Sequence, residues 1–232
     1  MESTPPNSTP AKPHHDRKKA RVLLVEDHSV VRQGLTLLID DEPDLHVCGG
    51  VGSVAEAIEA IEQLKPDIVL ADISLGEPSG LELIKLAHDR HPDLPILALS
   101  MHDEAVYAER ALRAGARGYV MKKEATDRVL TAIRRVLAGE IYLSDRMSNR
   151  LLRKLVHPEQ AEDVVPTETL SAREFEVFNL IAKGVGPTEI AQRLNLSVKT
   201  IETHRERIKE KLRLRSGAEL TRYAVQWHLD HG

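Results

Sequence analysis

The stretch DIVLADISLGEPSGLELI, residues 67–84, decides the fold of the first half of the chain. It begins with an apolar, β-branched run, reaches a single carboxylate at Asp72, and passes through a loop into an amphipathic run at 79–90. This order is typical of a buried strand followed by a helix. Because ligands of parallel α/β sheets bind beyond the carboxyl ends of the strands, Asp72 lies where a functional site is expected.

The same alternation continues on both sides of this stretch. Five strands alternating with five helices predict an α/β domain. The strands are almost continuously apolar, which indicates a doubly wound, five-stranded parallel sheet with helices on both faces. The other apolar runs are 21–25, 46–51, 95–100 and 118–121, and the other helical patterns lie near 29–40, 54–64, 103–114 and 125–138.

Length and composition place the chain among globular proteins. It has 232 residues, 41% of them hydrophobic, and its single cysteine, Cys48, cannot form an internal disulfide. Proteins of this size without disulfide bonds are typical of reducing compartments. No apolar run approaches the roughly 20 residues that span a bilayer, and the N-terminus lacks the apolar core of a signal peptide. We therefore expect a cytoplasmic protein with no membrane partner.

The chain divides into four expected segments. Residues 1–19 are rich in Pro, Ser, Thr and charge, and are predicted to be a disordered arm. The α/β domain is expected over 20–142, followed by a polar, proline-containing linker over 143–166 with a helical pattern near 144–155. Residues 167–232 show only helical patterns and are predicted to form a small all-α domain.

The all-α segment has the spacing of a helix-turn-helix at about 187–206. A short helix, a tight turn at 195–197 and a longer helix at 198–213 fit that motif. The whole chain has a formal net charge of -4, but seven Lys or Arg and only three Glu lie between Lys199 and Arg215. Local positive charge of this kind favours contact with nucleic-acid phosphates. Capping residues mark the three helix starts: Ser171 with Glu174, Pro187, and Ser197.

Polar residues follow four of the expected strands. Glu26 and Asp27 follow the first, Asp72 the third, Ser100 the fourth and Lys122 the fifth. We expect these side chains to meet at one crevice. The carboxylates need a compensating cation, for which Mg²⁺ is suited, and a carboxylate can accept a phosphoryl group as an acyl phosphate. An ion pair between Lys122 and Asp72 is expected in the resting state.

The motifs LLVEDHSVVRQGL, DIVLADISLGEPSGLELI, LALSM and ARGYVMKK resemble a response-regulator receiver domain, with a flavodoxin-like fold, over about 20–142. The resemblance implies a phosphorylated Asp72 and a switch aromatic at Tyr119. Gly76 occupies a loop position where the family usually has a proline. The other implied site residues are Glu26, Asp27 and the Ser74 carbonyl for magnesium, and Ser100 and Lys122 for the phosphoryl group.

The string LSAREFEVFNLIAKGVGPTEIAQRLNLSVKTIETHRERIKEKL resembles the LuxR-type DNA-binding domain of the NarL/FixJ family over about 167–230. Ile201, Ile208 and Leu212 share one face of the expected third helix, and His204 is interpreted as packed beside them. The other faces would meet bases and phosphates in the major groove. The expected DNA-contacting residues are Lys199, Thr200, Glu202, Thr203, Arg205, Glu206, Arg207 and Lys209.

Together the two resemblances imply a two-component response regulator. A sensor histidine kinase would phosphorylate Asp72, and the modified protein, as a homodimer, would bind double-stranded DNA and control transcription. It would not be an enzyme, apart from assisting its own magnesium-dependent phosphorylation and dephosphorylation. Two alternatives stay open: a DNA-binding protein whose first domain is never phosphorylated, and an enzyme that turns over a phosphorylated metabolite.

Overall fold

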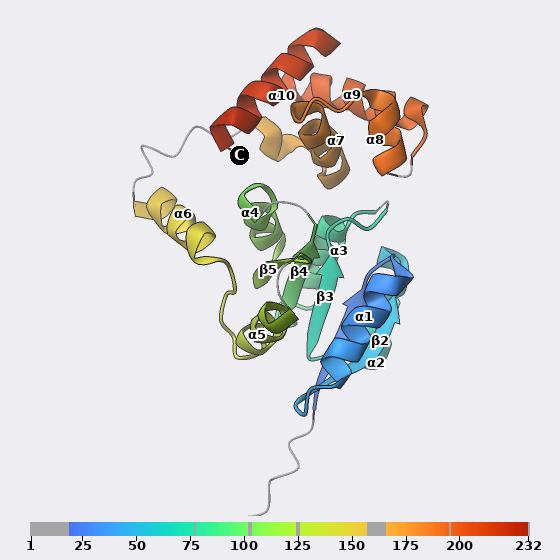
Figure 1. The fold of residues 1–232 in the computed structure, drawn as a ribbon, viewed down its shortest axis with the longest axis vertical. Coiled ribbons are helices and arrows are strands. Elements are labelled where there is room, and N and C mark those ends of the chain that lie inside the picture. The colour runs from blue at the N-terminus through green and yellow to red at the C-terminus, as the bar shows by residue number, and fades with distance from the viewer. Residues whose placement is uncertain are drawn as a thin grey trace, which may run out of the picture.

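The computed structural model describes residues 19–76, 78–101, 104–123, 126–156, 166–194 and 196–231 (Figure 1). The expected disordered arm lies outside this part of the chain except for Lys19. The first domain contains the predicted alternation of strands and helices. Its elements are β1 (Ala20–Val25), α1 (Ser29–Asp40), β2 (Leu45–Val51), α2 (Val54–Leu64), β3 (Ile68–Asp72), α3 (Gly80–Arg90), β4 (Ile96–Ser100), α4 (Glu104–Ala114), β5 (Gly118–Met121) and α5 (Thr126–Leu137).

The five strands form one parallel sheet in the order β2-β1-β3-β4-β5. Alternate residues of each strand face opposite layers, so Leu23 packs into one core cluster and Leu24 into another. The helices α2, α3 and α4 cover the first face, and α1 and α5 cover the second. The prediction of a doubly wound parallel sheet is therefore confirmed.

The rest of the described chain is helical. The helix α6 (Asp145–Val156) lies inside the expected linker, where the sequence showed a helical pattern. The C-terminal domain comprises η2 (Pro166–Thr169), α7 (Ala172–Ala182), α8 (Pro187–Arg193), α9 (Val198–Leu212) and α10 (Gly217–His231). Its core is aromatic: Phe175 and Phe178 both meet Trp227 edge-on, with ring centres 5.5 and 5.6 Å apart.

The capping predictions in this domain are confirmed. Ser171 and Glu174 form a complete capping box at the start of α7, and Pro187 is the first residue of α8. The Ser197 hydroxyl accepts a hydrogen bond from the Thr200 backbone amide at 3.0 Å. The Ser171 and Ser197 side chains satisfy amides that the first turns of α7 and α9 leave without partners. The first helix of the helix-turn-helix, α8, has no side-chain cap and begins instead at Pro187.

The C-terminal domain lies beyond one end of the sheet, with α7 next to α4 (Figure 1). The rings of Tyr107 on α4 and Phe175 on α7 meet edge-on with centres 5.3 Å apart. Both side chains are fully buried, so the two domains share apolar packing at this point. Across the described ranges, no helix combines the length and the apolar character that a membrane crossing requires.

Gly80, the first residue of α3, packs closely against the backbone at the end of β3. A Cβ atom at Gly80 would lie 1.9 Å from the Asp72 carbonyl oxygen and 2.7 Å from the Ile73 Cα. We predict that Gly80→Ala displaces the loop that follows Asp72 and lowers the free energy of unfolding by about 1–3 kcal/mol. Gly34→Ala is the control, because a Cβ there meets nothing within 4 Å inside α1. Urea unfolding followed by circular dichroism should show the opposite, stabilising change for Gly34→Ala, of up to about 1 kcal/mol.

Candidate functional site

Asp72 ends β3 and is completely buried. The Lys122 ammonium, just beyond β5, lies 2.7 Å from Asp72 Oδ2 and 2.5 Å from Glu26 Oε2. Burial raises the pKa of the Asp72 carboxyl, and the neighbouring Lys122 charge opposes that rise. The Lys122 ammonium thus contacts both buried carboxylates, and the His28 ring lies 3.2 Å from Glu26 Oε1.

The acidic residues after β1 complete this cluster. One ligand atom from each of Glu26, Asp27, His28 and Asp72 lies within 4.8 Å of all the others. The His28 Nδ1 atom lies 2.7 Å from Asp27 Oδ1, and the Asp27 charge raises the pKa of His28. Three carboxylates against one Lys122 ammonium leave a net negative charge. A donor set rich in carboxylate oxygen fits a hard divalent cation.

The other residues that the sequence placed at this site lie around Asp72. The Ser74 amide donates a hydrogen bond to Asp72 Oδ1 at 3.0 Å. Ser100 is fully buried at the end of β4, and its carbonyl accepts a hydrogen bond from the Lys122 amide at 2.7 Å. Tyr119 is buried on β5. The topology therefore brings Ser74, Ser100 and Lys122 to the carboxyl ends of the strands beside Asp72, whereas Tyr119 lies within β5, paired with Ala98.

The helix α9 has one buried face and one open face. Ile201, His204, Ile208 and Leu212 are buried, as expected from their spacing. Two of the expected DNA-contacting cations are engaged within the helix: Arg205 Nε lies 3.4 Å from Glu202, and Lys209 Nζ lies 2.8 Å from Glu206. Thr200 is partly exposed, and the exposed members of the expected set are Lys199, Glu202, Thr203, Glu206 and Arg207.

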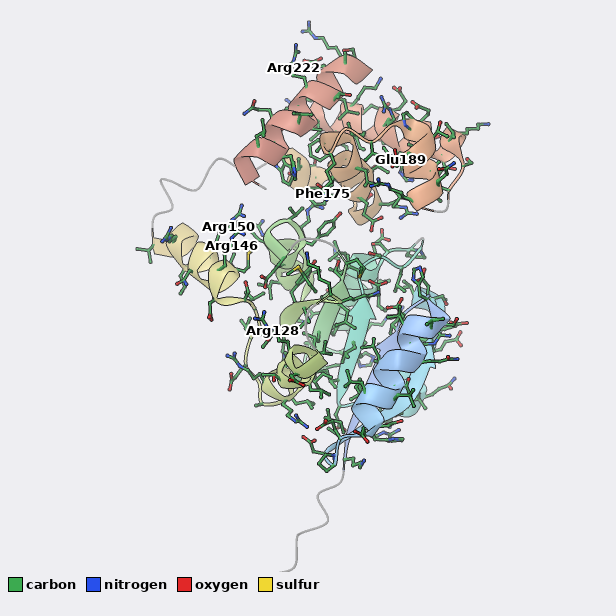
Figure 2. The ribbon with its side chains drawn as sticks, in the orientation of Figure 1. Arg128, Arg146, Arg150, Phe175, Glu189 and Arg222 are labelled. Carbon is green, nitrogen blue, oxygen red and sulfur yellow. The ribbon has the colours of Figure 1, made fainter. Side chains whose placement is uncertain are left out.

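The sequence analysis missed the residues that join the two domains. The Arg110 guanidinium of α4 lies 3.6 Å from the centre of the Phe175 ring and donates hydrogen bonds to the Leu170 and Thr167 carbonyls. Phe175 is labelled on α7 in Figure 2. Glu176, one residue further along α7, is almost fully buried. A charged residue among the apolar residues of AREFEVF was the only signal in the sequence, and it did not reveal the partner surface.

Comparison with known proteins identifies both domains. The model of the response regulator receiver domain matches residues 22–134, and that of the bacterial regulatory proteins of the luxR family matches 168–224. Oxygen regulatory protein NreC of Staphylococcus haemolyticus (strain JCSC1435) is 36% identical over 211 residues, which cover 89% of this chain and 97% of NreC. The chain belongs to the NarL/FixJ family of response regulators.

Solved structures of response regulators resemble this chain in both domains. One is RcsB from Salmonella enterica serovar Typhimurium bound to promoter rprA in the presence of the phosphomimetic BeF3-, with 25% identity, a TM-score of 0.56, and coverage of 90% of this chain and 99% of that one. Another shows two RcsB dimers bound to two parallel DNAs, with 26% identity, a TM-score of 0.54, and coverage of 89% and 98%.

This response regulator is therefore a two-component protein with a receiver domain and a DNA-binding helix-turn-helix. Its family consists of transcription regulators, which argues against the alternative of an enzyme for phosphorylated metabolites. A receiver domain implies a histidine kinase as partner. The acidic cluster at the end of its sheet is typical of a receiver metal site.

The central role of Lys122 in this response regulator can be tested by stability. Lys122→Gln leaves the buried Glu26 and Asp72 carboxylates facing each other without their ammonium. We predict that the free energy of unfolding at pH 7 falls by about 3 kcal/mol. Lys123→Gln is the control, because Lys123 is the adjacent, exposed lysine. Equal urea midpoints for the two variants would contradict this prediction.

Proposed function

We propose that Asp72 accepts a phosphoryl group from a sensor histidine kinase and that this modification controls DNA binding by α9. The observation that carries the proposal is the cluster of Asp72, Glu26 and Lys122 at the carboxyl edge of the sheet. An Asp72 oxygen would form a bond to phosphorus while the bond from phosphorus to the kinase imidazole breaks. The imidazole nitrogen leaves with the bonding electrons.

The residues around Asp72 would have different roles in this transfer. The Lys122 ammonium is already 2.7 Å from the acceptor carboxylate and would hold a phosphoryl oxygen after transfer. Glu26, Asp27, Asp72 and the Ser74 carbonyl would hold Mg²⁺. The bound metal would offset negative charge on the transferring group.

Ser100 and Tyr119 are suited to transmit a conformational change from phosphorylated Asp72 to the surface of the receiver. Both side chains are buried on neighbouring strands, β4 and β5, whose last residues pair through Ser100 and Met121. A hydroxyl that turns towards the phosphoryl group would leave space that the Tyr119 ring can fill. Such a change biases two arrangements that already exist, and it does not create a new one.

The DNA-binding half would act through the open face of α9. The proposed contacts are Lys199, Thr200, Glu202, Thr203, Arg205, Glu206, Arg207 and Lys209. The likeness to RcsB, seen on DNA as dimers and with a phosphomimetic, supports a homodimer that forms when this chain is phosphorylated. A two-fold dimer would match two half-sites about one helical turn apart.

The phosphoacceptor assignment predicts the outcome of a labelling experiment. With Mg²⁺ and acetyl phosphate, the wild-type chain should gain one phosphoryl group, detected by intact mass. Asp72→Asn should gain none, because an amide is not a nucleophile towards phosphorus under these conditions. Asp89→Asn, at an exposed site on α3, should label like the wild type. Labelling of Asp72→Asn at the wild-type level would refute the assignment, and an unlabelled wild type would support a receiver that is never phosphorylated.

The assignment of α9 predicts how salt affects DNA binding. Lys199→Ala removes an exposed cation from the start of the helix. With beryllofluoride and a random-sequence duplex, we expect weaker binding and a salt slope that is smaller by about one. Lys85→Ala, exposed on α3, changes the net charge equally and should keep the wild-type slope. Identical slopes for the two variants would remove Lys199 from the interface.

A further inference from the structure

His28 lies between the carboxylates that follow β1 and the first turn of α1. It is the N-cap residue of α1, with φ -79° and ψ 104°, yet its side chain does not cap the helix. An N-cap side chain normally accepts a hydrogen bond from an amide of the first turn. The His28 ring points instead towards the acidic residues before it: Nδ1 lies 2.7 Å from Asp27 Oδ1 and 3.2 Å from Glu26 Oε1. The ring is therefore oriented by the carboxylates and not by the helix.

Backbone hydrogen bonds hold His28 in this position. The His28 amide donates a hydrogen bond to Glu26 Oε1 at 3.1 Å. The Glu26 carbonyl in turn accepts a hydrogen bond from the Arg32 guanidinium of α1. The Glu26 side chain is only 1% exposed, so it is fixed by the core around it. The base of the His28 side chain is thus held next to the acidic cluster by β1 and α1, which is how a metal ligand is prepositioned.

The His28 nitrogen is close enough to the carboxylates to share an ion with them. The ligand atoms of His28, Glu26, Asp27 and Asp72 all lie within 4.8 Å of one another. Ligands of one first-row transition ion, each bonded at about 2.0–2.2 Å, lie about 3–4 Å apart. The His28 side chain is 69% exposed, so no packing opposes the small rotation that closes the remaining gap. The four groups can therefore contact a single ion.

An imidazole nitrogen changes the kind of ion that a carboxylate site favours. Mg²⁺ takes oxygen ligands, whereas imidazole suits ions such as Fe²⁺, Ni²⁺ and Zn²⁺. Carboxylate oxygens alone would give no preference for the second class. Within the described part of the chain, His28 is the one imidazole in this group of ligand atoms. The mixed nitrogen and oxygen donors therefore fit a divalent transition ion better than they fit Mg²⁺.

We propose that His28 is an additional metal ligand of the receiver and that its Nδ1 atom makes the site beside Asp72 selective for a divalent transition ion over Mg²⁺. The inference deepens the proposed function and rests on it for the role of the ion, which is to offset negative charge at Asp72. Mg²⁺ would still bind through the carboxylate oxygens. A transition ion would bind more tightly, because it gains the bond to nitrogen.

The competing role for His28 is that of a hydrogen-bonding brace for Asp27. The two roles differ in what they predict for ion selectivity. A brace orients the carboxylates for every divalent ion, so its loss weakens the binding of Mg²⁺ and of a transition ion to the same extent. A ligand nitrogen contributes to the binding of the transition ion and hardly to that of Mg²⁺. The ratio of the two affinities therefore separates a ligand from a brace.

The test measures Co²⁺ and Mg²⁺ binding to the full-length chain by isothermal titration calorimetry. His28→Gln keeps a side-chain amide that can donate a hydrogen bond to Asp27 but removes the imidazole. Co²⁺ should bind roughly tenfold more weakly or worse, and Mg²⁺ affinity should change by less than about threefold. His46→Gln is the matched control, because the exposed His46 ring lies 3.1 Å from Asp40 Oδ1 at the other end of the sheet. It should keep both wild-type affinities.

Labelling by acetyl phosphate locates the bound ion at Asp72. The Co²⁺ concentration that gives half-maximal labelling should rise roughly tenfold in His28→Gln and stay at the wild-type value in His46→Gln. Unchanged Co²⁺ affinity in His28→Gln, or equal losses for Co²⁺ and Mg²⁺, would overturn the ligand. A selective loss of Co²⁺ affinity in a chain that is never labelled at Asp72 would support the ligand and overturn the proposed function.

Discussion

The structure depends on one electrostatic constraint: buried carboxylates at the end of a parallel sheet share a single ammonium. Asp72 ends a completely apolar strand, and Glu26 approaches it from β1, so neither can be hydrated as it would be at a surface. Lys122 contacts both and compensates only part of their charge. The site therefore favours the binding of cations, and added negative charge there is energetically unfavourable.

The parallel topology of the sheet places the other polar residues beside these buried carboxylates. Parallel strands end at the same edge, so β1, β3, β4 and β5 deliver Glu26, Asp72, Ser100 and Lys122 to one region. Gly80 allows α3 to begin close against the backbone of Asp72 and Ile73. The chemistry at Asp72 is thus held by rigid elements, and rigid elements can transmit a change in charge to the surface that they support.

The C-terminal domain meets that surface through α7 and leaves α9 open. Its aromatic core extends from Trp227 to Phe175, and Phe175 is shared with Tyr107 and Arg110 of the receiver. The helix α7 therefore packs both in the aromatic core of the C-terminal domain and against α4 of the receiver. The receiver contacts α7, while Lys199, Thr203 and Arg207 of α9 are exposed. The contact between the domains is therefore separate from the face of α9 that is proposed to bind DNA.

The sequence by itself determined the elements and predicted which carboxylates, hydroxyl and lysine stand at the carboxyl ends of the strands. Strand and helix periods, the caps at Ser171 and Ser197, and the carboxylates at strand ends are local signals, each set by a few neighbouring residues. Only the tertiary structure decided that Glu176 is buried on α7 and that Arg110 meets Phe175, since contacts between domains depend on surfaces that no local pattern encodes. The physical reason is that burial and charge pairing across an interface depend on both partners at once.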